Sequence, residues 1–373
     1  MASDVVDLFV ELAALPSPPG EERAVADVIT RYLRDLGLTV DEDDAGSRVG
    51  STIGNVYARI EPTNDGGTPL FFCAHLDTVP PTGPIEPVID DGIVRNGADT
   101  ILGADNKAAV AVMLDATRRA LGENRPHSGI ELLFTPKEEV GLLGAAAFDH
   151  NRLLAQVGYV YDQAAAIGDV ILGAPYSHSM QVRFHGRAAH SGMYPEEGRS
   201  AIAAAARAIS DLRLGRIDEE TTANVGTIHG GTAGNIIPEW CTFLAEARSH
   251  DERKLQDVVQ EMLDAVSFAA GLEDCEVETE VHKSYRGYRF KRDADVVRIA
   301  HAALERSGFT PNYGLSGGAA DANVFNERGL RCLNLANGMQ DIHTPDERIA
   351  VEDLERMVEV TLALLDVARE TDG

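Results

Sequence analysis

The alternation of apolar and polar positions predicts helices and strands in turn along the first half of the chain. Val5, Leu8 and Leu12 recur at helical spacing, and Pro16 ends this first helix. On the same grounds, strands are predicted at 55–60, 70–74, 130–134 and 157–161, and helices at 25–36, 106–121 and 142–148. Strands that alternate with helices indicate an α/β domain with a mostly parallel sheet and helices on both faces.

From about residue 173 the pattern changes to that of an α+β unit. Strands are predicted at 180–186, 222–229, 240–248 and 276–283, and helices at 199–214 and 255–268. The α/β pattern returns after residue 285, with a strand at 330–335, and ends in a helix at 351–368. We therefore predict an α/β domain over 1–173 and 285–373, interrupted by an inserted α+β domain over 174–284.

Length and charge narrow the class of protein. The 373 residues fit two domains at roughly 100–200 residues each. The formal net charge of −27 argues against nucleic acid and an anionic membrane surface as partners, because both would repel the chain. The sequence has neither a run of about 18 apolar residues nor a secretory signal, so we expect a cytoplasmic protein. The four cysteines include no CxxC pair, which argues against a disulfide framework.

Acidic or imidazole side chains follow each predicted strand of the α/β domain. They are His75 and Asp77 after 70–74, Asp105 after a weak strand segment at 92–96 and just before 106–121, Glu138 and Glu139 after 130–134, Asp162 after 157–161, and His343 after 330–335. Taken singly, His75 fits a core histidine, and the adjacent glutamates fit a solvated surface. Ligands gather outside the carboxyl ends of the strands in open α/β sheets, however, so recurrence at five strand ends favours a site. Two imidazoles with several carboxylates suit a pair of divalent metal ions, most naturally zinc.

Five segments carry a resemblance to a known family. CAHLDTVP, ILGADNKAA, TPKEEVGLLGA, YDQ and IHTPDE resemble the motifs of the dinuclear zinc peptidase family that contains peptidase T, carboxypeptidase G, aminoacylase and succinyl-diaminopimelate desuccinylase. The resemblance covers almost the whole chain and is nearest to the peptidase T branch. It implies two Zn²⁺ per subunit, with Co²⁺ or Mn²⁺ as alternatives. The implied ligands are His75, Asp105 and Asp162 at one ion, and Asp105, Glu139 and His343 at the other, with Asp105 bridging.

The resemblance also implies roles around the metal ions. Glu138 would act first as general base, taking a proton from the water shared by the two metal ions. It would then act as general acid and give that proton to the leaving amine. Asp77 would accept the other N–H of His75. The inserted domain would be a lid and dimerisation domain, from which His190 reaches an active site across a homodimer and stabilises an oxyanion. The implied substrate contacts are Asn235, Arg248, Gly317 and Gly318.

The function implied is metal-dependent hydrolysis of an amide bond in a small peptide, by a tripeptidase-like aminopeptidase. An N-acyl amino acid amidohydrolase or a carboxypeptidase of the same family remains open. So does a catalytically silent dimer that binds metal or peptide. Peptidase T tends to have Asp and Arg where this chain has Asn106 and Ser316, which leaves the exact substrate undecided.

Overall fold

The computed structural model describes residues 5–63 and 66–371, which divide into two units. The first unit ends at Ala174 and resumes at Arg289, and the second comprises Pro175–Tyr288. The sequence-based prediction places the inserted domain at 174–284.

The first unit is built on a sheet of nine strands among the described residues. In spatial order they are β1 (Val40–Glu42), β2 (Val56–Ile60), β6 (Ile130–Thr135), β3 (Leu70–His75), β7 (Val157–Gln163), β16 (Arg331–Ala336), β8 (Asp169–Ala174) and β14 (Tyr288–Arg289), with β15 (Asn312–Leu315) paired to β8. The central strands β6, β3, β7 and β16 pair in parallel, whereas β1, β2 and β6 pair antiparallel, as do β16 and β8. The predicted largely parallel sheet is therefore present, with antiparallel strands toward its edges.

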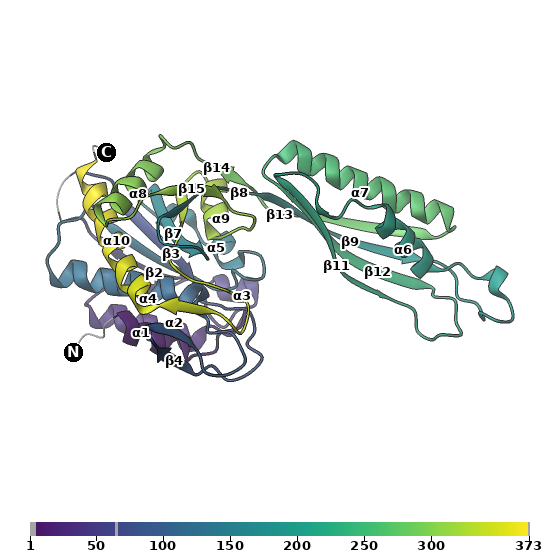
Figure 1. Ribbon diagram of the computed structural model, residues 1–373, viewed down its shortest axis with the longest axis horizontal. Coiled ribbons are helices and arrows are strands. Elements are labelled where there is room, and N and C mark those ends of the chain that lie inside the picture. Colours follow the sequence, from purple (N-terminus) through teal and green to yellow (C-terminus); the bar gives the residue numbers. More distant parts are fainter. Residues whose placement is uncertain (1–4, 64–65, 372–373) are drawn as a thin grey trace. The chain divides into compact units, whose positions relative to one another are not determined.

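Helices cover both faces of this sheet (Figure 1). They are α1 (Val5–Ala13), α2 (Arg23–Asp35), α3 (Ala45–Val49), α4 (Ala104–Gly122), α5 (Leu143–Ala147), α8 (Asp295–Arg306), α9 (Asp321–Glu327) and α10 (Val351–Glu370), with a short 3₁₀ helix at His150–Arg152. Successive side chains of a strand point to opposite faces, and β3 shows the result. The ring of Phe71 lies 5.0 Å from that of Phe325 in α9. The ring of Phe72 lies 6.1 Å from that of Tyr159, within the core that also contains α4 and α10.

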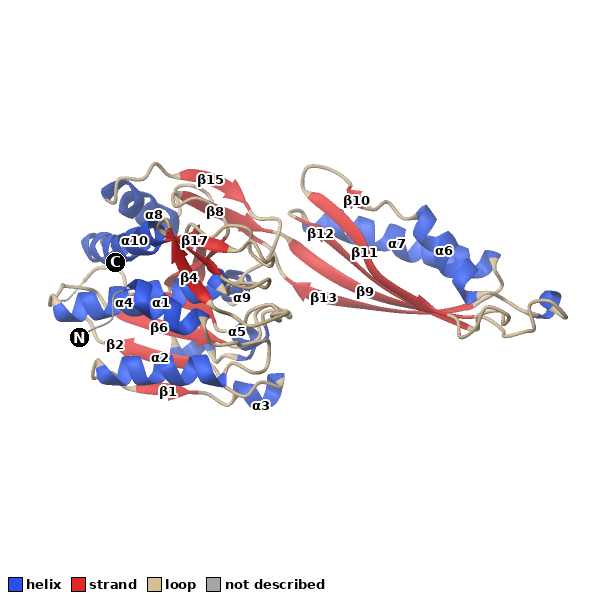
Figure 2. Ribbon diagram, turned by 60° about the horizontal axis from the view of Figure 1, so that its bottom comes forward, coloured by secondary structure: helices blue, strands red, loops and turns tan. Residues whose placement is uncertain are grey.

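The second unit is a five-stranded antiparallel sheet with its two long helices on one face (Figure 2). The strands lie in the order β10 (Gly215–Arg216), β11 (Thr221–Gly230), β12 (Trp240–Ser249), β9 (Tyr176–His185) and β13 (Glu276–Tyr285). The helices are α6 (Ala201–Asp211) and α7 (Glu252–Leu272), with a 3₁₀ turn at Pro195–Glu197. Val182, Phe184 and Phe243 are fully buried between sheet and helices. This is the predicted α+β order, with β10 added.

Several elements differ from their predicted bounds where candidate site residues lie. β3 includes His75, which pairs in parallel register with Thr135, so this histidine ends the strand rather than following it. β7 likewise includes Asp162. The helix predicted from residue 106 begins at Ala104, although Asp105 has non-helical angles of φ −83° and ψ 102°. β4 (Pro87–Asp90), β5 (Ile93–Asn96) and β17 (Arg348–Ala350) form a separate small sheet.

None of the helices within 5–63 and 66–371 is long and apolar enough to cross a membrane.

The central position of β6 predicts a large stability cost for a cavity there. Leu132 in β6 is 1% exposed, whereas Leu154, in the loop before β7, is 55% exposed. Replacing a buried leucine by alanine costs about 2–5 kcal/mol, because the cavity is only partly refilled. We expect Leu132→Ala to lose that much free energy of unfolding in denaturant titrations, and Leu154→Ala to stay within about 0.5 kcal/mol of the wild type. Equal losses in the two variants would contradict the assigned core.

Candidate metal centre

The candidate metal-binding side chains come from the carboxyl ends of the central parallel strands. His75 ends β3, Asp162 lies near the end of β7, and Glu139 follows β6. Asp105 lies in the first turn of α4, and His343 lies in the loop between β16 and β17. Because parallel strands all end at the same edge, residues far apart in the sequence meet there.

Asp105 occupies the centre of this group. Its Oδ1 lies 3.2 Å from His75 Nε2, and its Oδ2 lies 3.1 Å from His343 Nε2. The two oxygens of one carboxylate therefore face two different imidazoles. Beyond them, Asp162 Oδ1 lies 3.7 Å from His75 Nε2, and Glu139 Oε1 lies 3.0 Å from His343 Nε2. The five side chains thus form two sets that share Asp105.

These donor atoms fit a divalent metal ion. Ligand atoms of His75, Asp105 and Glu139 all lie within 4.8 Å of one another. Imidazole nitrogens mixed with carboxylate oxygens suit Zn²⁺ and related transition metals, whereas Ca²⁺ and Mg²⁺ prefer oxygen ligands alone. The chemistry of the side chains, as well as their proximity, therefore indicates a metal centre.

The electrostatics of the cluster show an excess of negative charge. Burial alone would lower the pKa of His75, but the carboxylates of Asp105 and Asp162 outweigh it and raise that pKa well above the usual value. Hydrogen bonds to Asp105 and Glu139 raise the pKa of His343 to about 10. Burial and the charge of Asp105 raise the pKa of Asp162 to about 7. Both imidazoles are thus driven toward the charged form, because the carboxylates around them need cationic partners.

Glu138 lies beside this cluster without being one of its five members. It is 8% exposed, and burial raises the pKa of its carboxyl well above the usual value. Its backbone N–H donates to Asp77 Oδ1 at 2.9 Å, and the N–H of Glu139 donates to Asp77 Oδ2 at 3.1 Å. The Asp77 carboxylate therefore holds the backbone of both glutamates.

This contact changes the role expected for Asp77. The carboxylate was expected to accept the second N–H of His75. In the structure the nearer acceptor is the backbone carbonyl oxygen of Asp77, 2.8 Å from His75 Nδ1, and the carboxylate lies 3.6 Å away. Asp77 thus contacts His75 most closely through its main chain, while its carboxylate also accepts the two backbone N–H groups beyond β6.

Three further buried carboxylates escaped the sequence-based prediction. Glu22 accepts the backbone N–H of Lys137 at 3.2 Å, one residue before Glu138. Asp321 accepts the hydroxyl of Thr135 at 2.5 Å. Glu347 accepts backbone N–H groups in the loop that carries Asp105. Glu347 belongs to the IHTPDE segment. Its partners are backbone N–H groups, which every residue except proline has, so the sequence does not indicate which residues it contacts.

The expected substrate contacts are divided between the two units. His190, Asn235 and Arg248 lie in the second unit, where His190 is exposed and Arg248 donates to Glu246 Oε2 at 2.9 Å. Gly317 and Gly318 precede α9 in the first unit. A Cβ at Gly317 would meet nothing within 4 Å, so the fold itself does not require glycine there. The roles of these residues stay predictions.

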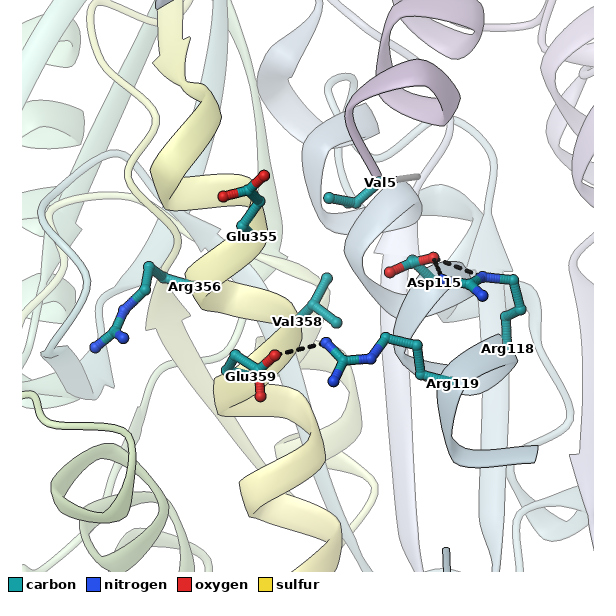
Figure 3. A pocket seen from close by; sticks show the side chains of 8 residues that line it. All are labelled: Val5, Asp115, Arg118, Arg119, Glu355, Arg356, Val358 and Glu359. Atoms are coloured by element: carbon teal, nitrogen blue, oxygen red, sulfur yellow. Dashed lines mark hydrogen bonds and ion pairs between the residues drawn. The ribbon is translucent and has the colours of Figure 1, made fainter. Parts of the chain in front are cut away.

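A separate pocket between α4 and α10 has a different character (Figure 3). Four of its charged side chains form two ion pairs: Arg118 Nη2 lies 2.6 Å from Asp115 Oδ1, and Arg119 Nη1 lies 2.5 Å from Glu359 Oε1. Its lining contains no imidazole. The combination of imidazoles with carboxylates that suits a transition metal is therefore found at the strand ends and not in this pocket.

Known proteins resemble both parts of the chain. Residues 173–272 match the family described as peptidase dimerisation domain, and residues 55–170 match peptidase family M28. The uncharacterized protein YqjE of Bacillus subtilis is 38% identical over 364 residues, which cover 98% of each chain. The crystal structure of an aminopeptidase, PepT, from Bacillus cereus is 39% identical with a TM-score of 0.89, and that of a tripeptidase from Staphylococcus aureus is 33% identical with a TM-score of 0.93. Each match covers 98% of both chains.

The central place of Asp105 predicts that metal binding depends on its carboxylate. Asp115 offers a matched control, because it is a second buried aspartate on α4 but pairs with Arg118. Loss of a group that merely orients a ligand weakens metal affinity about 10- to 100-fold, and loss of a shared ligand should cost at least as much. We expect Asp105→Asn to retain far less Zn²⁺ than the wild type after gel filtration, measured by elemental analysis, and Asp115→Asn to retain wild-type amounts. Equal zinc contents in all three proteins would contradict the assignment.

Proposed function

The chain belongs to the metallopeptidase family of peptidase T, and on that premise we propose that it is a tripeptidase-like aminopeptidase acting on small peptides. Members of this family hydrolyse peptide bonds, and the chain is a hydrolase of that class. The observation that carries the proposal is the Asp105 carboxylate shared by two imidazoles, with Glu138 beside it. That arrangement joins a metal centre to a group able to move a proton.

We propose two Zn²⁺ per subunit. His75 and Asp162 would hold one ion with one oxygen of Asp105, and Glu139 and His343 would hold the other with the second oxygen. The excess of buried carboxylates supports two dications, because unpaired charges of one sign are costly at low exposure. Bound divalent ions would polarise the scissile carbonyl and make an attacking water more acidic. Co²⁺ or Mn²⁺ can use the same ligands.

Glu138 is the general base and acid of the proposed reaction. Burial raises the pKa of its carboxyl, so the ionised carboxylate is a stronger base that can take a proton from the attacking water and hold it. It then delivers that proton to the nitrogen of the leaving amine as the amide bond breaks. The two hydrogen bonds from the Glu138–Glu139 backbone to Asp77 keep the carboxyl in place during both transfers.

The second unit is proposed as the dimerisation domain of a homodimer, which its family match supports. His190 Nδ1 accepts the backbone N–H groups of Gly192 and Met193 at 3.2 Å each. A neutral imidazole with Nδ1 as acceptor carries its proton on Nε2, so His190 presents an exposed donor suited to a developing oxyanion. Asn235, Arg248, Gly317 and Gly318 are proposed substrate contacts, and a cytoplasmic location remains our expectation.

The same centre also fits an N-acyl amino acid amidohydrolase or a carboxypeptidase, because all three reactions hydrolyse an amide. What separates them is recognition of the substrate's ends. A silent metal- or peptide-binding dimer is disfavoured, since the five donor side chains and Glu138 all lie together.

Removal of the Glu138 carboxyl should abolish most of the rate while leaving metal bound. Positioned proton transfer contributes about 10²- to 10⁴-fold to a rate. We expect Glu138→Ala to lower kcat for a zinc-loaded tripeptidase assay by that factor, with unchanged zinc content. Glu131→Gln, a change at a buried glutamate near the opposite end of β6, should retain wild-type kcat. An active Glu138→Ala enzyme would show that another group moves the proton.

Which end of the peptide the enzyme recognises provides an independent prediction. A panel of tripeptides with free or acetylated amino ends, assayed with Zn²⁺, Co²⁺ and Mn²⁺ in turn, separates the three candidate activities. We expect release of the first residue from free tripeptides, detected by chromatography of the products, and little turnover of acetylated ones. Preference for acetylated substrates would favour the amidohydrolase, and release of the last residue would favour the carboxypeptidase.

A further inference from the structure

Glu347 makes three hydrogen bonds to the loop that carries Asp105. Its Oε2 accepts the backbone N–H groups of Leu102 and Gly103, both at 2.8 Å, and its Oε1 accepts the N–H of Asp105 at 3.0 Å. The side chain is 1% exposed. Hydrogen bonds to an ionised acceptor are stronger than neutral ones, so one buried carboxylate fixes the main chain of three residues.

The backbone of that loop is irregular where α4 begins. Gly103, at the start of α4, has a left-handed φ of 79°, and Asp105 departs from helical angles. The first N–H groups of a helix have no partner within the helix, and Gly103 offers no side chain to accept them. Glu347 supplies the missing acceptor from a distant part of the chain, with a charge favourable to the helix N-terminus.

The segment that contributes Glu347 also contributes His343. Gln340 and Arg348 exchange backbone hydrogen bonds of 3.0 and 3.1 Å, which close this segment into a compact loop. Within it, the N–H of Glu347 donates to the carbonyl of Thr344 at 3.2 Å. One closed loop therefore contacts Asp105 twice, with His343 at its carboxylate and Glu347 at its backbone N–H.

We propose that Glu347 is a positioning residue that sets the distance between the Asp105 carboxylate and His343, and thereby the affinity of the metal ion held by Glu139 and His343. Without the Glu347 carboxylate, the loop that carries His343 loses its three hydrogen bonds to the backbone of the Asp105 loop. The ion beside His75 and Asp162 shares Asp105, but it takes its other two ligands from β3 and β7, so it should be affected less. This inference rests on the proposed two-ion centre.

Glu131 is a matched control within the same unit. It is 3% exposed, and it accepts the backbone N–H groups of Leu154 and Ala155 at 3.0 and 2.7 Å, as well as the hydroxyl of Tyr57 at 2.5 Å. It therefore resembles Glu347 in burial and in kind of contact. Glu131 lies near the start of β6, whereas the proposed metal ligands lie at or after the opposite, carboxyl ends of the strands.

The test is a Co²⁺ titration of metal-free wild type, Glu347→Gln and Glu131→Gln, followed by visible absorption. The amide keeps the size of the side chain but points an N–H₂ at one of the backbone donors. We expect two ions to bind the wild type and Glu131→Gln with the same affinities. In Glu347→Gln one ion should bind about 10- to 100-fold more weakly, the usual cost of losing a partner behind a ligand, and the other should bind nearly as in the wild type.

Thermal unfolding of the metal-free proteins separates positioning from general damage, since both variants lose backbone contacts of the same kind. If Glu347→Gln does not fold, Glu347→Asp keeps the charge on a shorter side chain and should weaken the same ion. If Glu347→Gln, or the folded Glu347→Asp, binds both ions with wild-type affinity, the role proposed for Glu347 is wrong, whereas the two-ion centre still stands. Equal weakening in Glu131→Gln overturns that role as well. A wild type that binds fewer than two ions instead refutes the two-ion centre.

Discussion

The crowding of carboxylates at one edge of a buried sheet is the constraint on which the rest of this structure depends. Asp105, Glu138 and Asp162 all lie where water is largely excluded, so their mutual repulsion is poorly screened. In the protein alone, the raised pKa values of His75 and His343 show these imidazoles acting as the cationic partners. Divalent ions between the same side chains would offset that charge more fully and free the imidazole nitrogens as ligands.

A second set of carboxylates makes this crowding geometrically possible. Asp77, Glu22 and Glu347 point at backbone N–H groups in the loops that carry the proposed ligands and Glu138. Loops between strands and helices leave such groups unpaired, and a buried unpaired N–H is costly. The acceptors therefore stabilise the fold and orient the site at once, while the parallel strands supply the rigid base that a metal centre needs.

The sequence predicts the parts of this arrangement that depend on residue type and periodicity. Apolar runs such as that of β3 locate the strands, and the acids and histidines after them indicate where ligands meet. Short exposed strands such as β4 lack an apolar pattern and were missed. So were Glu22 and Glu347, because their partners are main-chain groups that every residue has. His75 Nδ1 lies 2.8 Å from the carbonyl oxygen of Asp77 and 3.6 Å from its carboxylate, a difference that no sequence spacing encodes.

We propose above all that Asp105 divides the cluster into two metal positions. Anomalous diffraction at the zinc absorption edge, from crystals grown with Zn²⁺, addresses it most directly. We expect two peaks on opposite sides of the Asp105 carboxylate, one beside His75 and Asp162 and the other beside Glu139 and His343. A single anomalous peak, or peaks that lie away from the Asp105 carboxylate, would contradict the proposed two-ion centre.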